Sequence, residues 1–332
     1  MTPMWIWAVT IAVVVVVYTI ETIWAFKHPH EIPMKEAAFW ISFYFVAAML
    51  FAASLWFWRG HDIGIEFVAG YITELSLSVD NLFVFIIIMA SFSVPSIYQQ
   101  TLLQMGIVGA LILRFAFILA GAAAIERYSW MFYIFGAFLL LTAIKLLRQK
   151  HNLAEMPKSN LIIWLEKLIP LTSEYHGNKF KVKIDGKLMF TPMVIVIISI
   201  FMTDLIFALD SIPAIYGLTK DPYIVFTANA FALMGLRQMY FLLGGLLTRL
   251  VYLSFGLAFI LAFIGVKLLL HAHKEAGFNV PEIDTFVSLG VIITTLIIAV
   301  GLSLRATRDK QPMPVGIGEG LDQIAENKRE KH

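Results

Sequence analysis

Two short motifs each place a pair of acids inside an otherwise apolar stretch of the chain. Both read threonine, acid, five residues, acid and then an amide or hydroxyl residue, and they run from Thr73 to Leu82 and from Thr203 to Ile212. An ionisable group at the centre of a transmembrane helix costs roughly 2.5–3.5 kcal/mol, so four of them need compensation. The candidate site residues are the acids and the polar residue after each pair: Glu74, Asp80, Asn81, Asp204, Asp210 and Ser211.

Charge balance indicates the kind of ligand that these acids bind. Two arginines in apolar stretches, Arg114 and Arg237, offset only two of the four negative charges. One divalent cation or two protons would neutralise the remainder. The donors are all oxygen atoms, which suit Mg²⁺, Ca²⁺ or Mn²⁺ better than zinc or copper. We interpret the arginines as counter-charges or gating groups because a guanidinium cannot coordinate a metal. Purely structural ion pairing would leave two acids unexplained.

Composition places these acids in a membrane. The chain of 332 residues is 59% hydrophobic and 14% charged, with a mean hydropathy of +0.80, which is too apolar for a soluble domain of this size. It contains no cysteine, so disulfides, thiolate metal sites and cysteine nucleophiles are excluded within it. No nucleophile and base pair or cofactor motif stands out. We therefore expect neither an enzyme, nor a tightly bound cofactor, nor a nucleic-acid partner, and we expect the lipid bilayer as the surroundings.

The fold class that follows is an all-α polytopic membrane protein. Crossing roughly 30 Å of hydrocarbon takes about 20 apolar residues. Nine such runs are predicted at 4–26, 37–58, 66–90, 102–123, 130–147, 192–216, 224–247, 250–270 and 285–304.

Lysine and arginine placement predicts the orientation. Most of them fall in the loops after helices 1, 3, 5 and 7 and in the tail, and basic loops favour the cytoplasm. The N-terminus is therefore expected outside and the C-terminus inside a cell membrane (the inner or cytoplasmic membrane).

One long connection, 149–191, interrupts the helices. Residues 160–171 suit an amphipathic surface helix, and Asp185-Gly186 between two apolar-alternating runs predicts a small cytoplasmic β-hairpin. The tail from residue 305 reads as disordered. The expected units are N-terminal helices 1–60, repeat unit 1 at 61–148, this loop, repeat unit 2 at 192–271, helix 9 at 272–304 and the tail 305–332.

The repeat extends beyond the acidic motifs. Leu113-Arg114 matches Leu236-Arg237, and Ile144-Lys145 matches Val266-Lys267, in the same order after each acidic motif. The repeating unit is three helices. Because three is odd, the second copy enters the membrane from the opposite side, and such inverted repeats place the substrate near the midplane.

The two acids of one motif cannot point the same way on a straight helix. Six residues correspond to ~9 Å of rise and ~240° of rotation. If the two acidic helices cross antiparallel at their midpoints, Glu74 lies level with Asp210 and Asp80 with Asp204. Alternatively, a break near Pro213 lets all four acids converge.

At these motifs the sequence resembles the TerC family, named for tellurite resistance. The resemblance rests on E-L-S-L-S-V-D-N from Glu74 to Asn81 and on D-L-I-F-A-L-D-S-I-P-A from Asp204 to Ala214. It implies a membrane protein of metal-ion homeostasis, in particular of manganese export, with the four acids as ligands: Glu74, Asp80, Asp204 and Asp210.

Our functional hypothesis is a secondary transporter that exports a divalent cation, Mn²⁺ first and Ca²⁺ as the alternative, with protons as the expected exchange ion. A membrane-protein biogenesis or metallation factor that uses the loop 149–191 is a second hypothesis. Tellurite handling rests on the family name alone and conflicts with a negative site. The sequence leaves ion selectivity, stoichiometry, direction, coupling ion and oligomeric state open.

Overall fold

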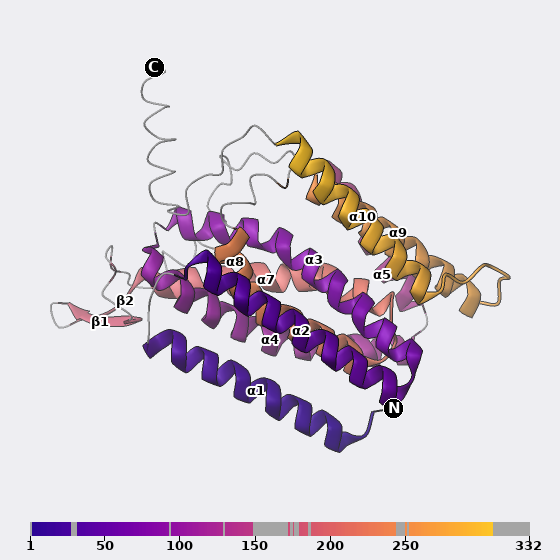
Figure 1. The fold of residues 1–332 in the computed structure, drawn as a ribbon, viewed down its shortest axis with the longest axis horizontal. Coiled ribbons are helices and arrows are strands. Elements are labelled where there is room, and N and C mark those ends of the chain that lie inside the picture. The colour runs from indigo at the N-terminus through magenta and orange to yellow at the C-terminus, as the bar shows by residue number, and fades with distance from the viewer. Residues whose placement is uncertain are drawn as a thin grey trace.

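The computed structural model is a bundle of long helices with one small hairpin (Figure 1). It describes residues 2–27, 32–92, 94–128, 130–148, 172, 175, 179–184, 187–243, 250 and 252–307. Within these ranges nine helices are present: α1 (Met4–Lys27), α2 (Met34–Arg59), α3 (His61–Ser91), α4 (Ser96–Arg127), α5 (Met131–Arg148), α7 (Pro192–Tyr216), α8 (Pro222–Leu243), α9 (Leu253–Glu275) and α10 (Thr285–Ala306). The predicted all-α fold is therefore confirmed.

Each predicted span corresponds to one of these helices. The 192–216 span coincides with α7, whereas α3 and α4 extend several residues beyond the apolar runs that predicted them. Eight of the nine are long and apolar enough to cross a membrane, and α8 is the exception. Its polar residues are tolerated because none of its described side chains is exposed. A helix surrounded by protein need not present an apolar surface to lipid.

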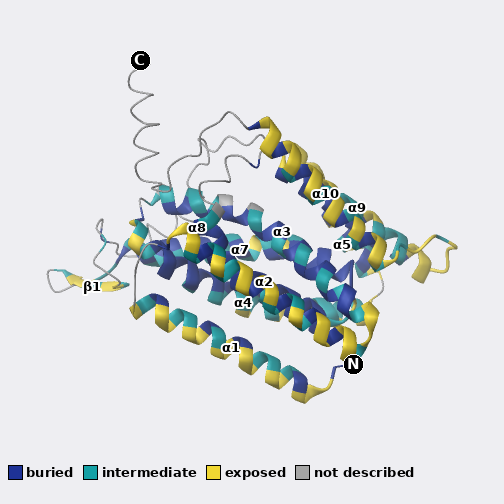
Figure 2. Cartoon of the chain, in the orientation of Figure 1, coloured by how far each residue is buried: buried dark blue, intermediate teal, exposed yellow. Residues whose placement is uncertain are grey.

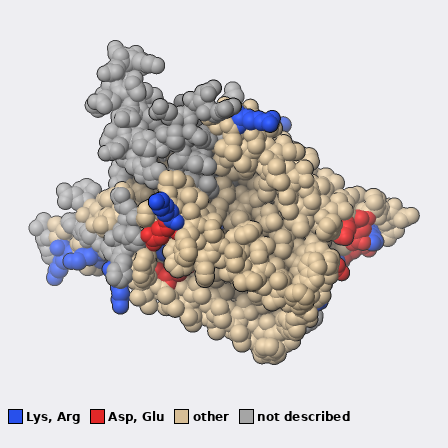
Figure 3. Space-filling model, in the orientation of Figure 1, with Lys and Arg blue, Asp and Glu red and all other residues tan. Residues whose placement is uncertain are grey.

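Burial separates an inner group of helices from a peripheral one. Buried residues concentrate on α3, α7, α8 and α9 and on the first part of α4, whereas α1, α2 and α10 turn apolar side chains outward (Figure 2). The space-filling view shows Lys, Arg, Asp and Glu near the two ends of the bundle and an uncharged belt between them (Figure 3). An apolar belt between charged ends is the surface that a bilayer requires.

Three helix pairs dominate the packing of the bundle: α3 with α8, α4 with α7, and α5 with α9. In the last pair the backbones approach closely at two glycines. A Cβ atom added to Gly136 would lie 2.8 Å from the carbonyl oxygen of Gly265, and one added to Gly265 would lie 3.0 Å from that of Gly136. Small residues at a crossing point let transmembrane helices pack at short range.

The predicted hairpin is present. Strands β1 (Lys181–Ile184) and β2 (Lys187–Phe190) pair antiparallel, with Lys181 opposite Phe190. Its Asp185-Gly186 turn, the predicted surface helix at 160–171 and the tail beyond residue 307 lie outside the described residues. We call the end of the bundle that holds this strand pair the hairpin end. The opposite end, where α7 ends and α8 and α10 begin, we call the cavity end.

The Gly136–Gly265 contact yields a stability prediction. Gly136→Ala should lower the melting temperature of the purified protein, because the new methyl group meets the backbone carbonyl of Gly265 as well as the Leu269 side chain, and overpacking costs about 1–3 kcal/mol. Gly290→Ala is the control, since a Cβ atom there meets nothing within 4 Å and alanine favours a helix by about 1 kcal/mol. Equal melting temperatures for the two variants would contradict the tight crossing.

Candidate functional site

The two acidic motifs meet at one arginine in the core of the bundle. Arg114 of α4 donates from Nε to Asp204 Oδ2 at 2.8 Å and from Nη2 to Asp204 Oδ1 at 3.0 Å. Its Nη1 donates to Glu74 Oε1. The first acid of each motif, Glu74 from α3 and Asp204 from α7, thus shares one guanidinium. The two-point contact with Asp204 is the geometry in which arginine binds carboxylates most strongly.

Two neutral groups complete this cluster. Arg114 Nη1 lies 3.2 Å from Ser211 Oγ of α7 and 3.4 Å from Asn229 Oδ1 of α8. The three charged residues are at most 1% exposed. We call Glu74, Arg114, Asp204, Ser211 and Asn229 the arginine cluster; it draws on four helices.

Hydrogen bonding in the arginine cluster is incomplete. Glu74 Oε2 and Asn229 Nδ2 are buried with no hydrogen-bond partner. Two carboxylates face one guanidinium, so the cluster carries a formal charge of −1 when both acids are ionised. A buried oxygen without a donor and an excess negative charge are costly in protein interiors. Both features suit the approach of a further cation or proton.

Close helix packing sets the position of Arg114. A Cβ atom on Gly106 of α4 would lie 2.4 Å from Ile200 of α7, and one on Gly109 would lie 2.8 Å from Phe201. These glycines let α4 lie against α7, so that Arg114, further along the same helix, faces Asp204. Asp204 lies one helical turn after Ile200, so it is close to the place where α7 packs against Gly106 of α4.

The structure does not gather all six predicted residues at Arg114. Asp210 accepts a hydrogen bond of 2.9 Å from Thr142 of α5 instead. Asn81 is buried on α3, and the side chain of Asp80 lies outside the described residues. Glu74 therefore shares its partner with Asp204 rather than with Asp210, and both helices run without a break through their motifs.

The second predicted counter-charge, Arg237 of α8, has a different environment. It is 5% exposed, and its Nη1 has no hydrogen-bond partner. The amide of Gln238, oriented so that both its ends are satisfied, accepts from Arg237 Nη2 at 2.9 Å. Among the described residues no acid lies within ion-pair distance of this guanidinium.

Sequence reasoning missed Asn229 and Thr142. Asn229 had a usable signal, because an amide inside an apolar run of a membrane protein calls for a partner. Thr142 had none, since threonine in a helix commonly bonds its own backbone. Within the ranges that the structure describes, no group of three or more His, Asp or Glu residues forms a ready metal site.

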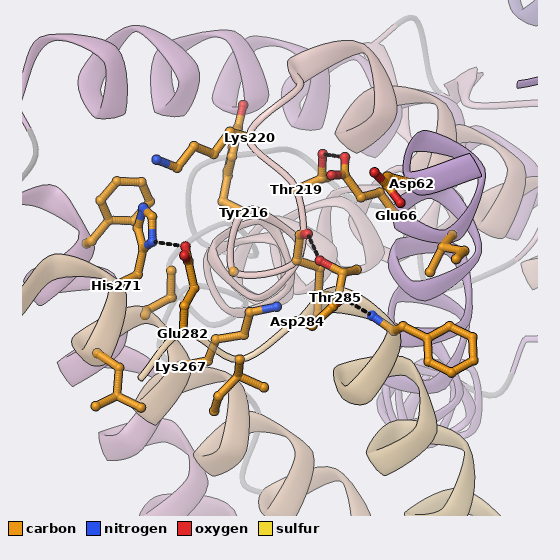
Figure 4. A pocket seen from close by; sticks show the side chains of 18 of the residues that line it. Asp62, Glu66, Tyr216, Thr219, Lys220, Lys267, His271, Glu282, Asp284 and Thr285 are labelled. Atoms are coloured by element: carbon orange, nitrogen blue, oxygen red, sulfur yellow. Dashed lines mark hydrogen bonds and ion pairs between the residues drawn. The ribbon is translucent and has the colours of Figure 1, made fainter. Parts of the chain in front are cut away.

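A cavity of about 680 Å³ opens at the cavity end of the bundle. Its lining is of mixed charge: Glu66 accepts from Thr219, and His271 faces Glu282 on the other side (Figure 4). Hydrogen bonding from Lys274 lowers the pKa of Glu282, so this loop carboxylate stays ionised at neutral pH. Glu66 precedes Glu74 by eight residues on α3, which is ~12 Å of helix.

Comparison with known proteins gives the relationship of the whole chain. Its sequence is 40% identical to an uncharacterized membrane protein of Mycobacterium tuberculosis over 92% of this chain and 80% of the relative. It is 38% identical to an Escherichia coli protein named "Putative membrane-bound redox modulator Alx", over 85% of this chain and 89% of the relative. An uncharacterized membrane protein of Myxococcus xanthus shares 36% identity.

No solved structure matches the chain. The pattern of the integral membrane protein TerC family matches residues 59–311, which include α3 to α10 with both acidic motifs and both buried arginines. Helix α1 and nearly all of α2 precede the matched part. By this match and by the extent of the relatives, the chain belongs to the TerC family of integral membrane proteins.

Proposed function

We propose that the protein is a secondary transporter that moves a divalent cation, Mn²⁺ in the first place, out of the cell through the acids of the arginine cluster. One observation carries the proposal. Glu74 and Asp204, from different helices, meet deep in the bundle with one guanidinium between them and one carboxylate oxygen unpaired. Intramembrane acids that face the bundle interior commonly mark ion pathways.

The available ligands favour a hard divalent cation. Carboxylate, amide and hydroxyl oxygens surround the cluster, and these suit Mn²⁺, Ca²⁺ and Mg²⁺. Arg114 keeps a fixed positive charge and cannot be a ligand, so a bound cation has to displace it from at least one acid. Asp80 and Asp210, one or two turns away on the same helices, would supply further oxygens once the helices shift.

Alternating access fits the way in which the helices pair. The two proposed repeats are α3–α4–α5 and α7–α8–α9, and exchanging one for the other turns the pair α3 and α8 into α7 and α4. The pair α5 and α9 maps onto itself. A set of contacts that survives this exchange is what an inverted repeat with a pseudo-two-fold axis produces. We take the hairpin end as cytoplasmic because basic residues concentrate there.

We propose proton exchange as the energy source for metal export. No nucleotide-binding motif occurs in the sequence. The same carboxylates can bind either a metal ion or protons, so proton entry on one face would release the metal on that face. Thiol redox chemistry, which the name of the E. coli relative invites, would need cysteine, and the 332 residues contain none.

Flux in proteoliposomes tests the carboxylate mechanism. We expect pH-gradient-driven Mn²⁺ movement for the wild-type protein and at least a tenfold lower rate for Asp204→Asn and Asp80→Asn, because each change removes a negative ligand at nearly constant volume. Asp62→Asn is the matched control, since that side chain lies at the cavity end and is 95% exposed.

Two outcomes would contradict the proposal. Normal flux in both site variants would remove the acids from the mechanism. Absence of flux for Mn²⁺, Ca²⁺ and Mg²⁺ in the wild-type protein, under either direction of the pH gradient, would remove transport itself.

A biogenesis or metallation factor is the second candidate, and the hairpin favours it. The strand pair projects beyond the helices (Figure 1), and it exposes Lys181, Lys183 and the apolar Leu188 to possible partners.

Replacing 181–190 with a short glycine–serine linker separates the two candidates. A transporter should keep its Mn²⁺ flux within about twofold, since Asp204 lies twelve residues or ~18 Å along α7 from its start at Pro192. Loss of partner capture with intact flux would assign the hairpin a separate role, and loss of flux in a folded protein would contradict this separation.

A further inference from the structure

The two buried arginines are equivalent in sequence but not in environment. Arg114 of α4 and Arg237 of α8 occupy the same place in the two three-helix units, each preceded by leucine. Both are at least 95% buried. Among the described side chains, Arg114 has four partners, whereas Arg237 contacts the Gln238 amide next to it and leaves Nη1 unpaired. The structure is therefore asymmetric at the point where the sequence repeats.

The contacts of Arg114 specify what the equivalent contacts of Arg237 would be. Arg114 spans Asp204 and Ser211, which lie seven residues apart on the partner helix α7. The partner helix of α8 is α3. The residues that correspond to Asp204 and Ser211 on α3 are Glu74 and Asn81, which are also seven residues apart.

Glu74 and Asn81 form a second set of partners, which Arg237 can reach. Asn229, which touches Arg114, and Arg237 are eight residues apart on α8, or ~12 Å toward the hairpin end. Asn81 lies ~10 Å beyond Glu74 in the same direction on α3. Arg237 and Asn81 thus lie at similar depth on packed helices, both buried. Glu74 Oε2 is the carboxylate oxygen that Arg114 leaves free.

We propose that the two arginines serve in turn as the built-in cation of the Glu74–Asp204 pair. Arg114 holds both acids in the conformation described above, with Ser211 as its neutral partner. In the opposite-facing conformation Arg237 holds them, with Asn81 as its neutral partner, and Arg114 is released. This rests on the proposed function: the transported cation displaces whichever arginine is bound to Glu74 and Asp204. Without a transported cation, the protein therefore changes conformation with one arginine bound to these acids.

Energetics support an exchange rather than a permanent arrangement. A buried guanidinium without an acid is costly, and removing one member of a buried ion pair is strongly destabilising. In the described residues both arginines are buried and Arg114 alone contacts acids, so burying Arg237 is favourable if it contacts acids in another state. Arg114 takes up both oxygens of Asp204 and Oε1 of Glu74, so Arg237 cannot make the equivalent set of contacts at the same time, and the two arrangements are alternatives.

The test measures conformation without any transported ion. Because the chain has no cysteine, spin labels can be attached at two introduced ones, Asp62→Cys on α3 and Lys220→Cys between α7 and α8, on opposite sides of the cavity. The distance distribution between them is recorded in lipid nanodiscs with a chelator present. Two populations are expected, one with Arg114 and one with Arg237 bound to Glu74 and Asp204.

Variants of the neutral partners should shift these populations in opposite directions. Ser211→Ala removes a neutral partner of Arg114, and Asn81→Ala removes the proposed neutral partner of Arg237. Each should therefore change the ratio of the two conformations by roughly threefold to tenfold, in opposite directions. Arg237→Gln should act like Asn81→Ala and more strongly, whereas Arg127→Gln, an exposed arginine on the helix of Arg114, should leave the ratio unchanged. Ser211→Ala and Asn81→Ala keep every buried charge, so they remain informative if Arg237→Gln does not fold.

Shifts in the same direction, or no shift for Asn81→Ala and Arg237→Gln, would overturn the exchange. The result is independent of transport. Opposite shifts in a protein that moves no cation would support the exchange and refute the transporter, whereas normal Mn²⁺ flux without any shift would do the reverse.

Discussion

The contact of Arg114 with Glu74 and Asp204 is the constraint on which the rest of the bundle depends. Charges this deeply buried are costly without partners, and losing one partner of a buried ion pair typically costs about 3–5 kcal/mol. Satisfying Arg114 requires α3, α4, α7 and α8 to meet at one level. The close approach at Gly106 and Gly109 is needed to bring α4 there. Apolar residues would make this core at least as stable, so stability alone does not explain the charges.

The membrane explains the second feature of the fold, the contrast between α8 and the other helices. Lipid-facing helices such as α1, α2 and α10 need apolar surfaces, and they have them. Helix α8 can carry Asn229, Arg237 and Gln238 because its neighbours shield it from lipid. The polar chemistry of the protein is thereby concentrated where no solvent or lipid competes for hydrogen bonds, and each contact there is stronger and each missing contact more costly.

Much of the fold followed from the sequence, because hydropathy over about 20 residues is a strong signal and Asp-Gly between alternating runs is a specific one. The partners of the acids did not follow. Two residues six positions apart point to different sides of a helix, and which side faces the core depends on the rotation of that helix against its neighbours. Hence the sequence grouped the four acids with the two arginines, but the sharing of Arg114 by Glu74 and Asp204 and the pairing of Asp210 with Thr142 depended on helix packing.

A repeated sequence in an asymmetric structure has a specific physical meaning. If both halves formed the same contacts, the two arginines would compete for the same oxygen atoms of Glu74 and Asp204, of which Arg114 occupies all but Glu74 Oε2. In the part of the chain that the structure describes, Arg114 lies on the acids and Arg237 has no acid within ion-pair distance, which avoids that competition and leaves Arg237 Nη1 unpaired. On the proposed exchange, the mirror arrangement with the roles reversed is the second state, and its energy is expected to be similar because the residues that form it are nearly equivalent. Two states of similar energy that differ in which helix pair is tied together are what a protein needs in order to present one site to two sides of a membrane.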